Sequence, residues 1–183
     1  MRINDFKSAL LGGGARANQF SIQINFPEFA LDNGLDRANQ ADMQLLCKAA
    51  QLPASTIADV PLNYRGRVVH VAGERSFAPW SITVINDTGF TIRNALERWS
   101  SRIQDYPSTE GVTIPQSYQK DMLVTQLDRN GEKLKEYKFI DAYPTSIGEI
   151  QLSYDTNDQV EEYTVEFTYN YFTTDFKPIK VKK

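Results

Sequence analysis

The sequence has little of the chemistry on which most catalytic and metal sites depend. It contains one cysteine, Cys47, and one histidine, His70, among 183 residues. A single cysteine excludes an intrachain disulfide and a cysteine-based zinc site. A single histidine leaves little material for a metal centre or a Ser-His-Asp triad. We therefore expect neither an enzyme nor a bound cofactor or metal.

An excess of positive charge is also missing. Twenty lysine and arginine residues stand against 23 aspartate and glutamate residues, which gives a net charge of −3. A protein that grips nucleic acid through its phosphates needs a concentrated basic surface. The composition therefore argues against stable binding of DNA or RNA.

Long apolar runs are lacking as well. The N-terminal stretch MRINDFKSALLGGG holds too short an apolar run for a signal peptide. No stretch reaches the roughly 18 apolar residues that a transmembrane helix needs. We expect a chain without a membrane anchor that is made in a cytoplasm.

What the sequence does contain is apolar and polar alternation with a period of two, typical of half-buried strands. Phe20, Ile22 and Ile24 alternate with polar residues until Pro27, and the strongest alternation follows Glu162. The pair Asn130-Gly131 favours a tight hairpin turn. The polar stretch 28–41 predicts a loop. Strands are predicted over 18–26, 43–50, 66–72, 80–86, 118–128, 132–143 and 162–172, with a short further segment at 147–154.

One clear amphipathic helix interrupts these strands. Its apolar side chains fall on one face, with Thr88 as the expected N-cap and Pro107 as the expected stop; they are Ile92, Ala95, Leu96, Trp99 and Ile103. Together the patterns predict a mainly β fold. We expect a β-sandwich or curled barrel of about seven or eight strands with one main α-helix.

The few residues with chemical potential have simpler structural interpretations. His70 lies between Val69 and Val71 and is interpreted as a sheet histidine, and Cys47 as a small core residue. Glu161 and Glu162 are adjacent, so on a strand they point to opposite faces. An arginine cluster is interpreted as a solvated edge or as ion-pair partners of a neighbouring subunit, in preference to a nucleic-acid site; it comprises Arg65, Arg67 and Arg75.

Four blocks in a fixed order carry a specific resemblance. They are 47–53 (CKAAQLP), 72–87 (AGERSFAPWSITVIND), 143–152 (YPTSIGEIQL) and the aromatic strand 162–172. In this order the chain resembles the tail tube proteins of contractile-tailed bacteriophages, from about Phe6 to Phe172. The resemblance implies the phage tail tube fold, with an N-terminal arm at 1–17 and a β domain at 18–172. It makes 28–41 an inserted loop and 173–183 a C-terminal extension.

The same resemblance implies a structural function in the virion tail. Copies of the chain would form stacked hexameric rings around a lumen for DNA. The implied partners are the chain itself, the tail sheath, the baseplate tube-initiation protein and the tail-terminator protein. DNA would pass transiently and without specificity, and a slightly acidic lumen would let its phosphates slide.

The family pattern also indicates which segments reach the next ring. These are the arm 2–11 and an expected loop at 59–66. The inter-subunit contact candidates are therefore Phe6, Leu10, Asn63, Tyr64, Arg65, Glu74 and Arg75. Glu74 and Arg75 either form an ion pair between subunits or brace their own turn.

Two other functions fit parts of the sequence. The tube protein of a contractile injection or secretion system would share the fold and carry effectors in place of DNA. A monomeric β-sandwich binding module, from a different class, would show an exposed aromatic platform. Self-association separates this second alternative from a tube subunit.

Overall fold

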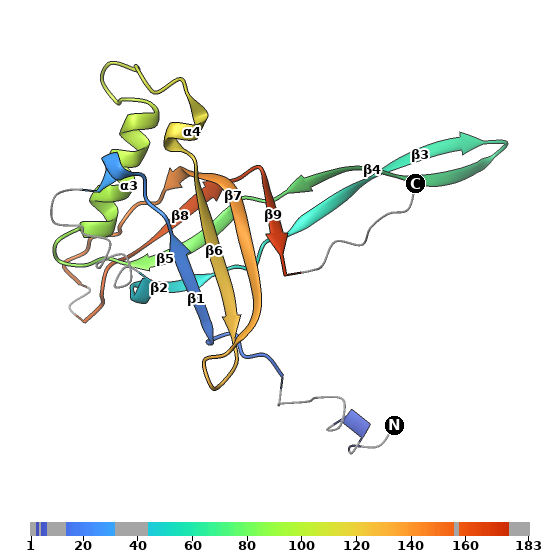
Figure 1. Cartoon of the computed structure of the whole chain (residues 1–183), viewed down its shortest axis with the longest axis horizontal. Helices are drawn as coiled ribbons and strands as arrows, with labels where there is room; N and C mark the ends of the chain where they lie inside the picture. The colour runs from blue at the N-terminus through green and yellow to red at the C-terminus, as the bar shows by residue number, and fades with distance from the viewer. Residues whose placement is uncertain (1–2, 4, 7–13, 32–43, 156–157, 176–183) are drawn as a thin grey trace.

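The computed structural model describes residues 3, 5–6, 14–31, 44–155 and 158–175. A curled antiparallel sheet carries one main helix, and a long hairpin projects from it (Figure 1). Most of the predicted arm, including Leu10, lies outside the described residues, as do 32–43 and 176–183. The proposed division into arm, domain, insertion and extension stays a prediction.

Seven strands form the large sheet. Its order is β1-β6-β7-β8-β5-β2, and β9 pairs with β7 beside this path. The strands are β1 (Phe20–Ile24), β2 (Cys47–Ala50), β5 (Trp80–Ile85), β6 (Lys120–Leu127), β7 (Lys133–Ile147), β8 (Glu162–Thr168) and β9 (Tyr171–Thr174).

The long strand β7 joins the two halves of this sheet. Its stretch 137–139 pairs with both β6 and β9, whereas 143–147 pairs with β8. The change from β9 to β8 occurs around Asp141, whose φ of 57° lies in the left-handed region. The Asp141 N–H donates to the Asp121 carboxylate, and the Asn170 amide donates to the Asp141 carboxylate at 2.9 Å. These contacts hold the bend that curls the sheet.

The predicted helix is α3 (Thr91–Ile103), and its boundaries differ from the expectation. Asp87, not Thr88, satisfies the first turn: its carboxylate accepts from the Thr91 N–H at 2.9 Å and from the Thr91 hydroxyl. The helix ends at Ile103, well before Pro107. Short helices η2 (Glu28–Ala30) and α4 (Pro115–Tyr118) lie near it.

Aromatic residues fill the core between α3 and the sheet. The predicted apolar stripe of α3 is buried there, except that Ile103 is only partly buried. Trp80 stacks on Phe139 with ring centroids 4.4 Å apart, and Trp99 meets Phe26 edge-on. Both indole N–H groups donate to backbone carbonyls at 2.8 Å, so their burial leaves no unpaired donor. Cys47 belongs to this core, as predicted.

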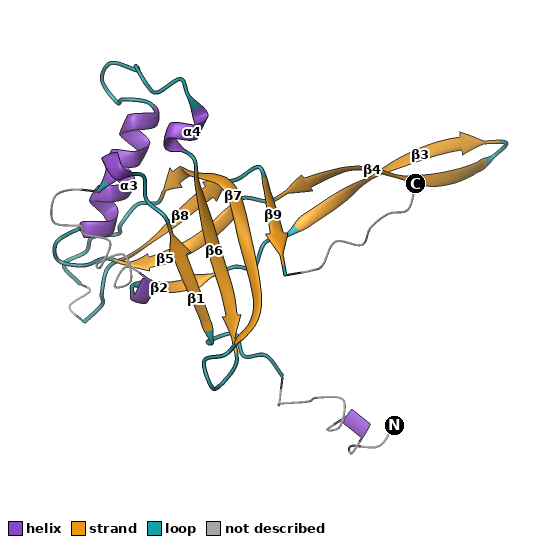
Figure 2. Cartoon of the chain, in the orientation of Figure 1, coloured by secondary structure: helices purple, strands orange, loops and turns teal. Residues whose placement is uncertain are grey.

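The predicted fold class is confirmed: the protein is mainly β with one main helix (Figure 2). The described residues form nine strands, against the expected seven or eight. The predicted hairpin turn is present, with Gly131 at φ 81° and its N–H bonded to the Asp128 carbonyl. Two expectations are wrong. Residues 59–64 lie in a strand and not in a loop, and 148–154 contains no strand.

Candidate assembly interface

The most unusual feature is a hairpin that stands apart from the sheet. Strands β3 (Ser55–Tyr64) and β4 (Arg67–Phe77) pair only with each other and extend away from the body (Figures 1 and 2). Every residue of β3 is exposed, and in β4 only Gly73 and Phe77 are partly buried. An isolated two-stranded hairpin is at best marginally stable in water. The hairpin therefore calls for a surface to pack against.

One face of the hairpin is apolar. Residues directly opposite each other in an antiparallel pair share a face. Val60 faces Val71, and Leu62 faces Val69. These four side chains are 43–52% exposed, so about half of each surface still meets solvent. Tyr64 extends the same face to the end of β3.

The opposite face of the hairpin mixes polar and apolar residues. There Pro61 faces His70, and Asn63 faces Val68. Asp59 lies diagonally across from His70, and its carboxylate is 2.6 Å from the His70 Nδ1. The pair is more than half exposed, so its contribution to stability is small. The contrast between the faces makes the hairpin amphipathic.

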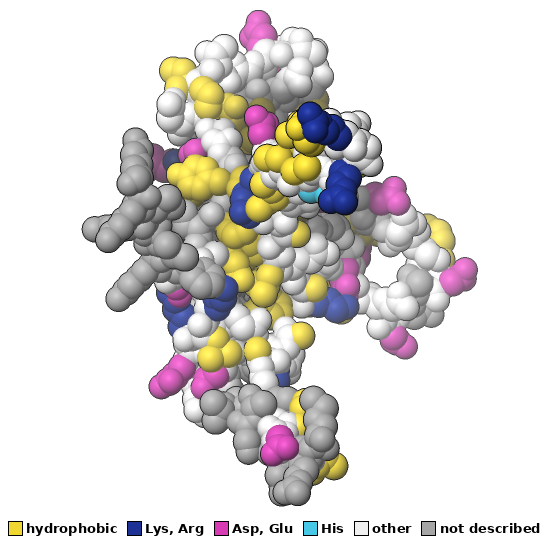
Figure 3. All heavy atoms as spheres, turned by 90° about the vertical axis from the view of Figure 1, so that its right-hand side faces the viewer, with side chains coloured by type: hydrophobic (Ala, Val, Ile, Leu, Met, Phe, Trp, Pro, Cys, Tyr) yellow, Lys and Arg dark blue, Asp and Glu magenta, His cyan; other side chains and the backbone are white. Residues whose placement is uncertain are grey.

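The end of the hairpin is basic. Arg65 and Gly66 have φ angles of 47° and 80°, as a two-residue turn of the primed type requires. The Arg65 guanidinium lies 5.4 Å from the centre of the Tyr64 ring. Arg67 follows directly after the turn. Figure 3, which views the molecule from the hairpin end, shows basic side chains beside a strip of hydrophobic ones.

The base of the hairpin is fastened to the body. Phe77 packs edge-on against Phe172 at 5.4 Å and against Tyr169. Arg75 donates from Nη1 to the Ser55 hydroxyl at 2.8 Å, across the two strands. Among the described ion pairs none joins Glu74 to Arg75. Arg75 thus braces the hairpin, and whether Glu74 meets another subunit stays a prediction.

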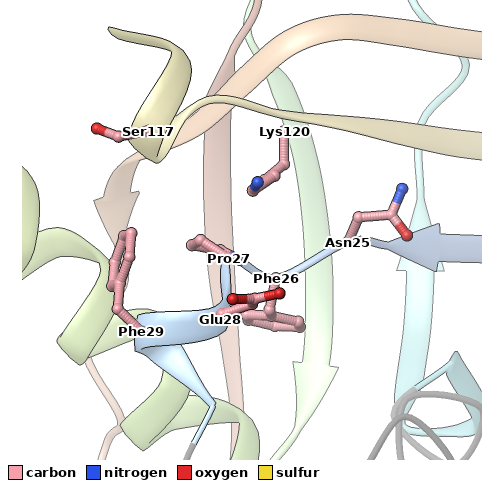
Figure 4. Close-up of a pocket in the computed structure, with 7 residues that line it drawn as sticks. All are labelled: Asn25, Phe26, Pro27, Glu28, Phe29, Ser117 and Lys120. Carbon is pink, nitrogen blue, oxygen red and sulfur yellow. The ribbon is translucent and has the colours of Figure 1, made fainter. Parts of the chain in front are cut away.

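A surface hollow elsewhere offers little chemistry. It has a volume of about 530 Å³, and Figure 4 shows Lys120 and Glu28 at its walls. Its remaining lining is Asn25, Phe26, Pro27, Phe29 and Ser117. Within the described ranges no three His, Cys, Asp or Glu side chains are grouped to hold a metal. Nor does a described helix have the length and apolar character to span a membrane.

The possible reactive groups have structural roles. Burial raises the pKa of the Cys47 thiol to about 12, so it stays protonated at neutral pH. The Glu161 carboxylate accepts from Asn86, and that of Glu162 meets Lys48. The two carboxylates therefore have separate partners, as their adjacency in the sequence predicts.

The structure brings together some of the predicted contact residues. Asn63, Tyr64 and Arg65 lie at the end of the hairpin, whereas Glu74 and Arg75 lie near its base. The expected cluster of three arginines is therefore wrong, because β4 separates Arg75 from the other two. Phe6 is 62% exposed, and Leu10 lies outside the described residues.

Sequence reasoning missed the apolar face formed by Val60, Leu62, Val69 and Val71. The alternation of apolar and other side chains at Val60, Leu62 and Tyr64 could have indicated this face. Pro61 obscured it, since proline is normally excluded from the interior of a sheet. In β3 it is tolerated because this strand pairs on one side only.

The chain is similar in sequence and in fold to proteins of contractile tails and injection systems. Over 174 residues the chain is 28% identical to tail tube protein gp19 of Enterobacteria phage T4, covering 94% of this chain and 99% of that protein. The fold is similar to a chain of the anti-feeding prophage tube-terminating cap, with a TM-score of 0.64 at 14% identity, covering 90% of this chain and 92% of that one. It is also similar to a chain of the sheath-tube complex of an extracellular contractile injection system, with a TM-score of 0.52 at 15% identity and coverages of 92% and 95%.

A family model supports the same assignment. Residues 15–175 match the model described as phage tail tube protein. The match includes all nine strands and the hairpin. It accounts for a chain with an exposed apolar ribbon on the hairpin. This chain belongs to the phage tail tube protein family, a family of structural proteins of the virion tail.

Proposed function

We propose that copies of this chain close into hexameric rings, which stack into a hollow tube through which phage DNA passes. The family membership supports the tube, and the resemblance to contractile-tail proteins supports the hexameric ring. The single observation that carries the proposal is the amphipathic hairpin, β3–β4. Its apolar face needs a partner surface, and a second copy of the same chain supplies one in a tube.

The energetics of that face favour association. Burying the exposed part of each of five side chains contributes about 1 kcal/mol per residue, or about 5 kcal/mol per hairpin. The residues are Val60, Leu62, Tyr64, Val69 and Val71. One such contact barely offsets the entropy lost when two molecules associate. A closed ring makes many equivalent contacts at once, which explains why assembly and not dimerisation is expected.

Strand edges add a second driving force. β1 and β2 lie at the two ends of the path through the large sheet, each with one partner among the described strands. Open edges present unpaired backbone N–H and C=O groups. Pairing the edge of one subunit with that of the next closes a ring and satisfies those groups.

The other proposed partners are the tail sheath, a baseplate protein that starts the tube and a terminator that ends it. The fold's likeness to chains from a sheath-tube complex and from a tube-terminating cap supports them. It also keeps the injection-system tube as the second candidate function. The chain aligns with a phage tail tube protein over 94% of its length, at 28% identity. This similarity favours DNA over effectors as cargo.

Negative-stain electron microscopy of the purified chain, at low and high concentration, tests the proposal. We expect rings with six-fold symmetry or hollow tubes of uniform width. A chain that stays monomeric even when incubated with the cognate tube-initiation protein would contradict the proposal and favour a monomeric binding module.

A matched pair of variants tests the role of the apolar face. Val69 and Val68 are neighbours with 51% and 52% exposure, but they lie on opposite faces of the hairpin. We expect Val69→Asn to abolish tubes, because a buried amide without a hydrogen-bond partner is costly. Val68→Asn should retain them, because it lies on the other face and adds no charge to the basic end of the hairpin. Equal effects of the two variants, measured by sedimentation, would show that the faces are not distinguished.

A further inference from the structure

A second exposed surface complements the hairpin in charge. Residues 149–162 contain five acidic residues and no basic one. The described parts of this stretch, 149–155 and 158–162, are here named the acidic segment. It also exposes large apolar side chains: Leu152 is 78% exposed, Tyr154 fully and Val160 67%. Such a surface suits a partner that is both basic and apolar.

Part of this charge has no cationic partner among the described residues. Glu162 meets Lys48, and Glu161 accepts from Asn86. Asp155 and Asp158 are exposed and take part in no ion pair among the described residues. Glu149 is exposed too and accepts from the uncharged Gln151 amide. Within the described part of the subunit, three carboxylates thus have no cationic partner.

The end of the hairpin has the matching properties. Residues 62–69, here named the hairpin tip, expose Leu62, Tyr64 and Val69 beside Arg65 and Arg67. The tip contains two basic residues and no acidic one. No described ion pair joins either arginine to a carboxylate of its own chain.

The two surfaces lie at opposite ends of the molecule. The hairpin joins the body at Phe77, close to Trp80, which pairs with Phe167 of β8. The acidic segment enters β8 at Glu162, which pairs with Ile85 at the other end of β5. Figure 1 shows the hairpin extending to one side of the body and the orange segment that follows β7 on the other.

The family resemblance already implies that this part of the chain reaches the next ring. We propose that the surface it meets there is the acidic segment of a second copy of this chain. This inference rests on the proposed function. Arg65 and Arg67 would face Glu149, Asp155 and Asp158, and Tyr64 would pack among Leu152 and Tyr154. Complementary charge fixes the register, while the apolar side chains supply the buried area.

The position of the two surfaces determines the kind of assembly. A contact between different patches is heterologous, so each subunit keeps one free tip and one free acidic segment at the two ends of a stack. Such a contact does not close on itself along the stacking direction. It therefore gives a tube that grows by addition of rings.

Charge reversal tests the contact. R65E/R67E and, separately, D155K/D158K should each raise the critical concentration for tubes at least tenfold. Combining the four changes should restore most of the assembly, because the charges again attract. As a matched control, R129E reverses an exposed turn arginine elsewhere and should not rescue D155K/D158K.

Cysteine trapping supplies a second measurement. Under mild oxidation, Y64C alone and L152C alone should give little crosslinking. The double variant Y64C/L152C should give a ladder of covalent oligomers, because each chain carries both halves of the contact. Cys47 is buried, so it should form no crosslink in any of the samples.

The outcomes separate this inference from the proposed function. If the wild-type chain forms no ring or tube, even with its initiator, both are overturned. If it assembles but neither reversal raises the critical concentration and the double variant does not crosslink, only the tip contact is wrong. If R65E/R67E loses binding to double-stranded DNA in fluorescence anisotropy while assembly is unchanged, the tip serves DNA instead.

Discussion

At the scale of single residues, Asp141 determines the shape of the sheet. It adopts a left-handed backbone conformation in which a residue with a β-carbon is strained. Aspartate tolerates this conformation better than most residues, and its carboxylate also accepts from Asn170. Asp141 thus both forms the bend of β7 and contacts the loop before β9.

Substitution of Asp141 should therefore destabilise the body. We expect Asp141→Val to lower the free energy of unfolding by about 2 kcal/mol, from backbone strain in a β-branched residue and the lost hydrogen bond. Asp141→Asn should cost less than about 1 kcal/mol, since asparagine tolerates the same conformation. Urea unfolding followed by the fluorescence of Trp80 and Trp99 measures both. Equal losses would mean that the backbone conformation at 141 is unimportant.

The Cys47 thiol should be unreactive toward alkylating reagents in the folded protein. Its thiol pKa is raised to about 12 from 9.0, because burial disfavours the thiolate. We expect iodoacetamide at pH 8 to label it only in denaturant, as detected by mass spectrometry. Rapid labelling of the native chain would show that the core opens around β2.

The same shift makes a prediction about pH. Above about pH 9 the unfolded thiol ionises while the folded one does not, so the unfolded state releases protons first. The contribution of Cys47 to stability is therefore complete below that pH and falls as the pH rises toward 12. Cys47→Ser should show a weaker alkaline loss of stability than the wild type.

At the scale of elements, the hairpin is an appendage of the body. None of its residues belongs to the buried core, and Phe77 alone packs against the core's edge. Its conformation is therefore decoupled from the folding of the sheet. Its stability should come from the neighbouring subunit.

Removal of the hairpin tests this independence. We expect replacement of 56–76 by a short Gly-Ser linker to change the Tm of the body by no more than a few degrees, because no core contact is lost. The same deletion should abolish tubes in electron micrographs. A large fall in Tm would show that the hairpin supports the fold itself.

At the scale of the whole molecule, the net charge is only −3, but positive and negative side chains are concentrated on different surfaces. The hairpin tip is basic and the acidic segment lies at the other end. Exposed charges are screened as salt rises, with a Debye length of roughly 10 Å at 0.1 M and roughly 3 Å at 1 M. A tube held partly by such contacts should therefore be sensitive to salt.

We expect the critical concentration of the wild-type chain to rise several-fold between about 0.05 and about 0.5 M NaCl. R65E/R67E should show a smaller salt dependence, since the attraction is already absent. Sedimentation of tubes across the salt series measures both slopes. Identical slopes would place the salt-sensitive contacts elsewhere on the subunit.

The sequence by itself determined the elements whose pattern is local. The alternation at Phe20–Ile24 and after Glu162, the stripe of α3 and the Asn130-Gly131 turn follow from side-chain periodicity and turn preference. The residues that make up each of these patterns lie within a few positions of one another in the sequence. The blocks that resemble tail tube proteins likewise needed no coordinates.

Only the tertiary structure decided which strands lie in the core and which project from it. Ser55–Tyr64 alternates like a half-buried strand, yet all of it is exposed, because its apolar face has no partner within one subunit. The alternation of side chains in the sequence shows that one face of a strand is apolar, but it does not show what covers that face. The separation of Arg75 from Arg65 follows from the pairing of β3 with β4 into one extended hairpin. The separation of the hairpin tip from the acidic segment depends on how β5 and β8 are paired, a long-range property that no local pattern encodes.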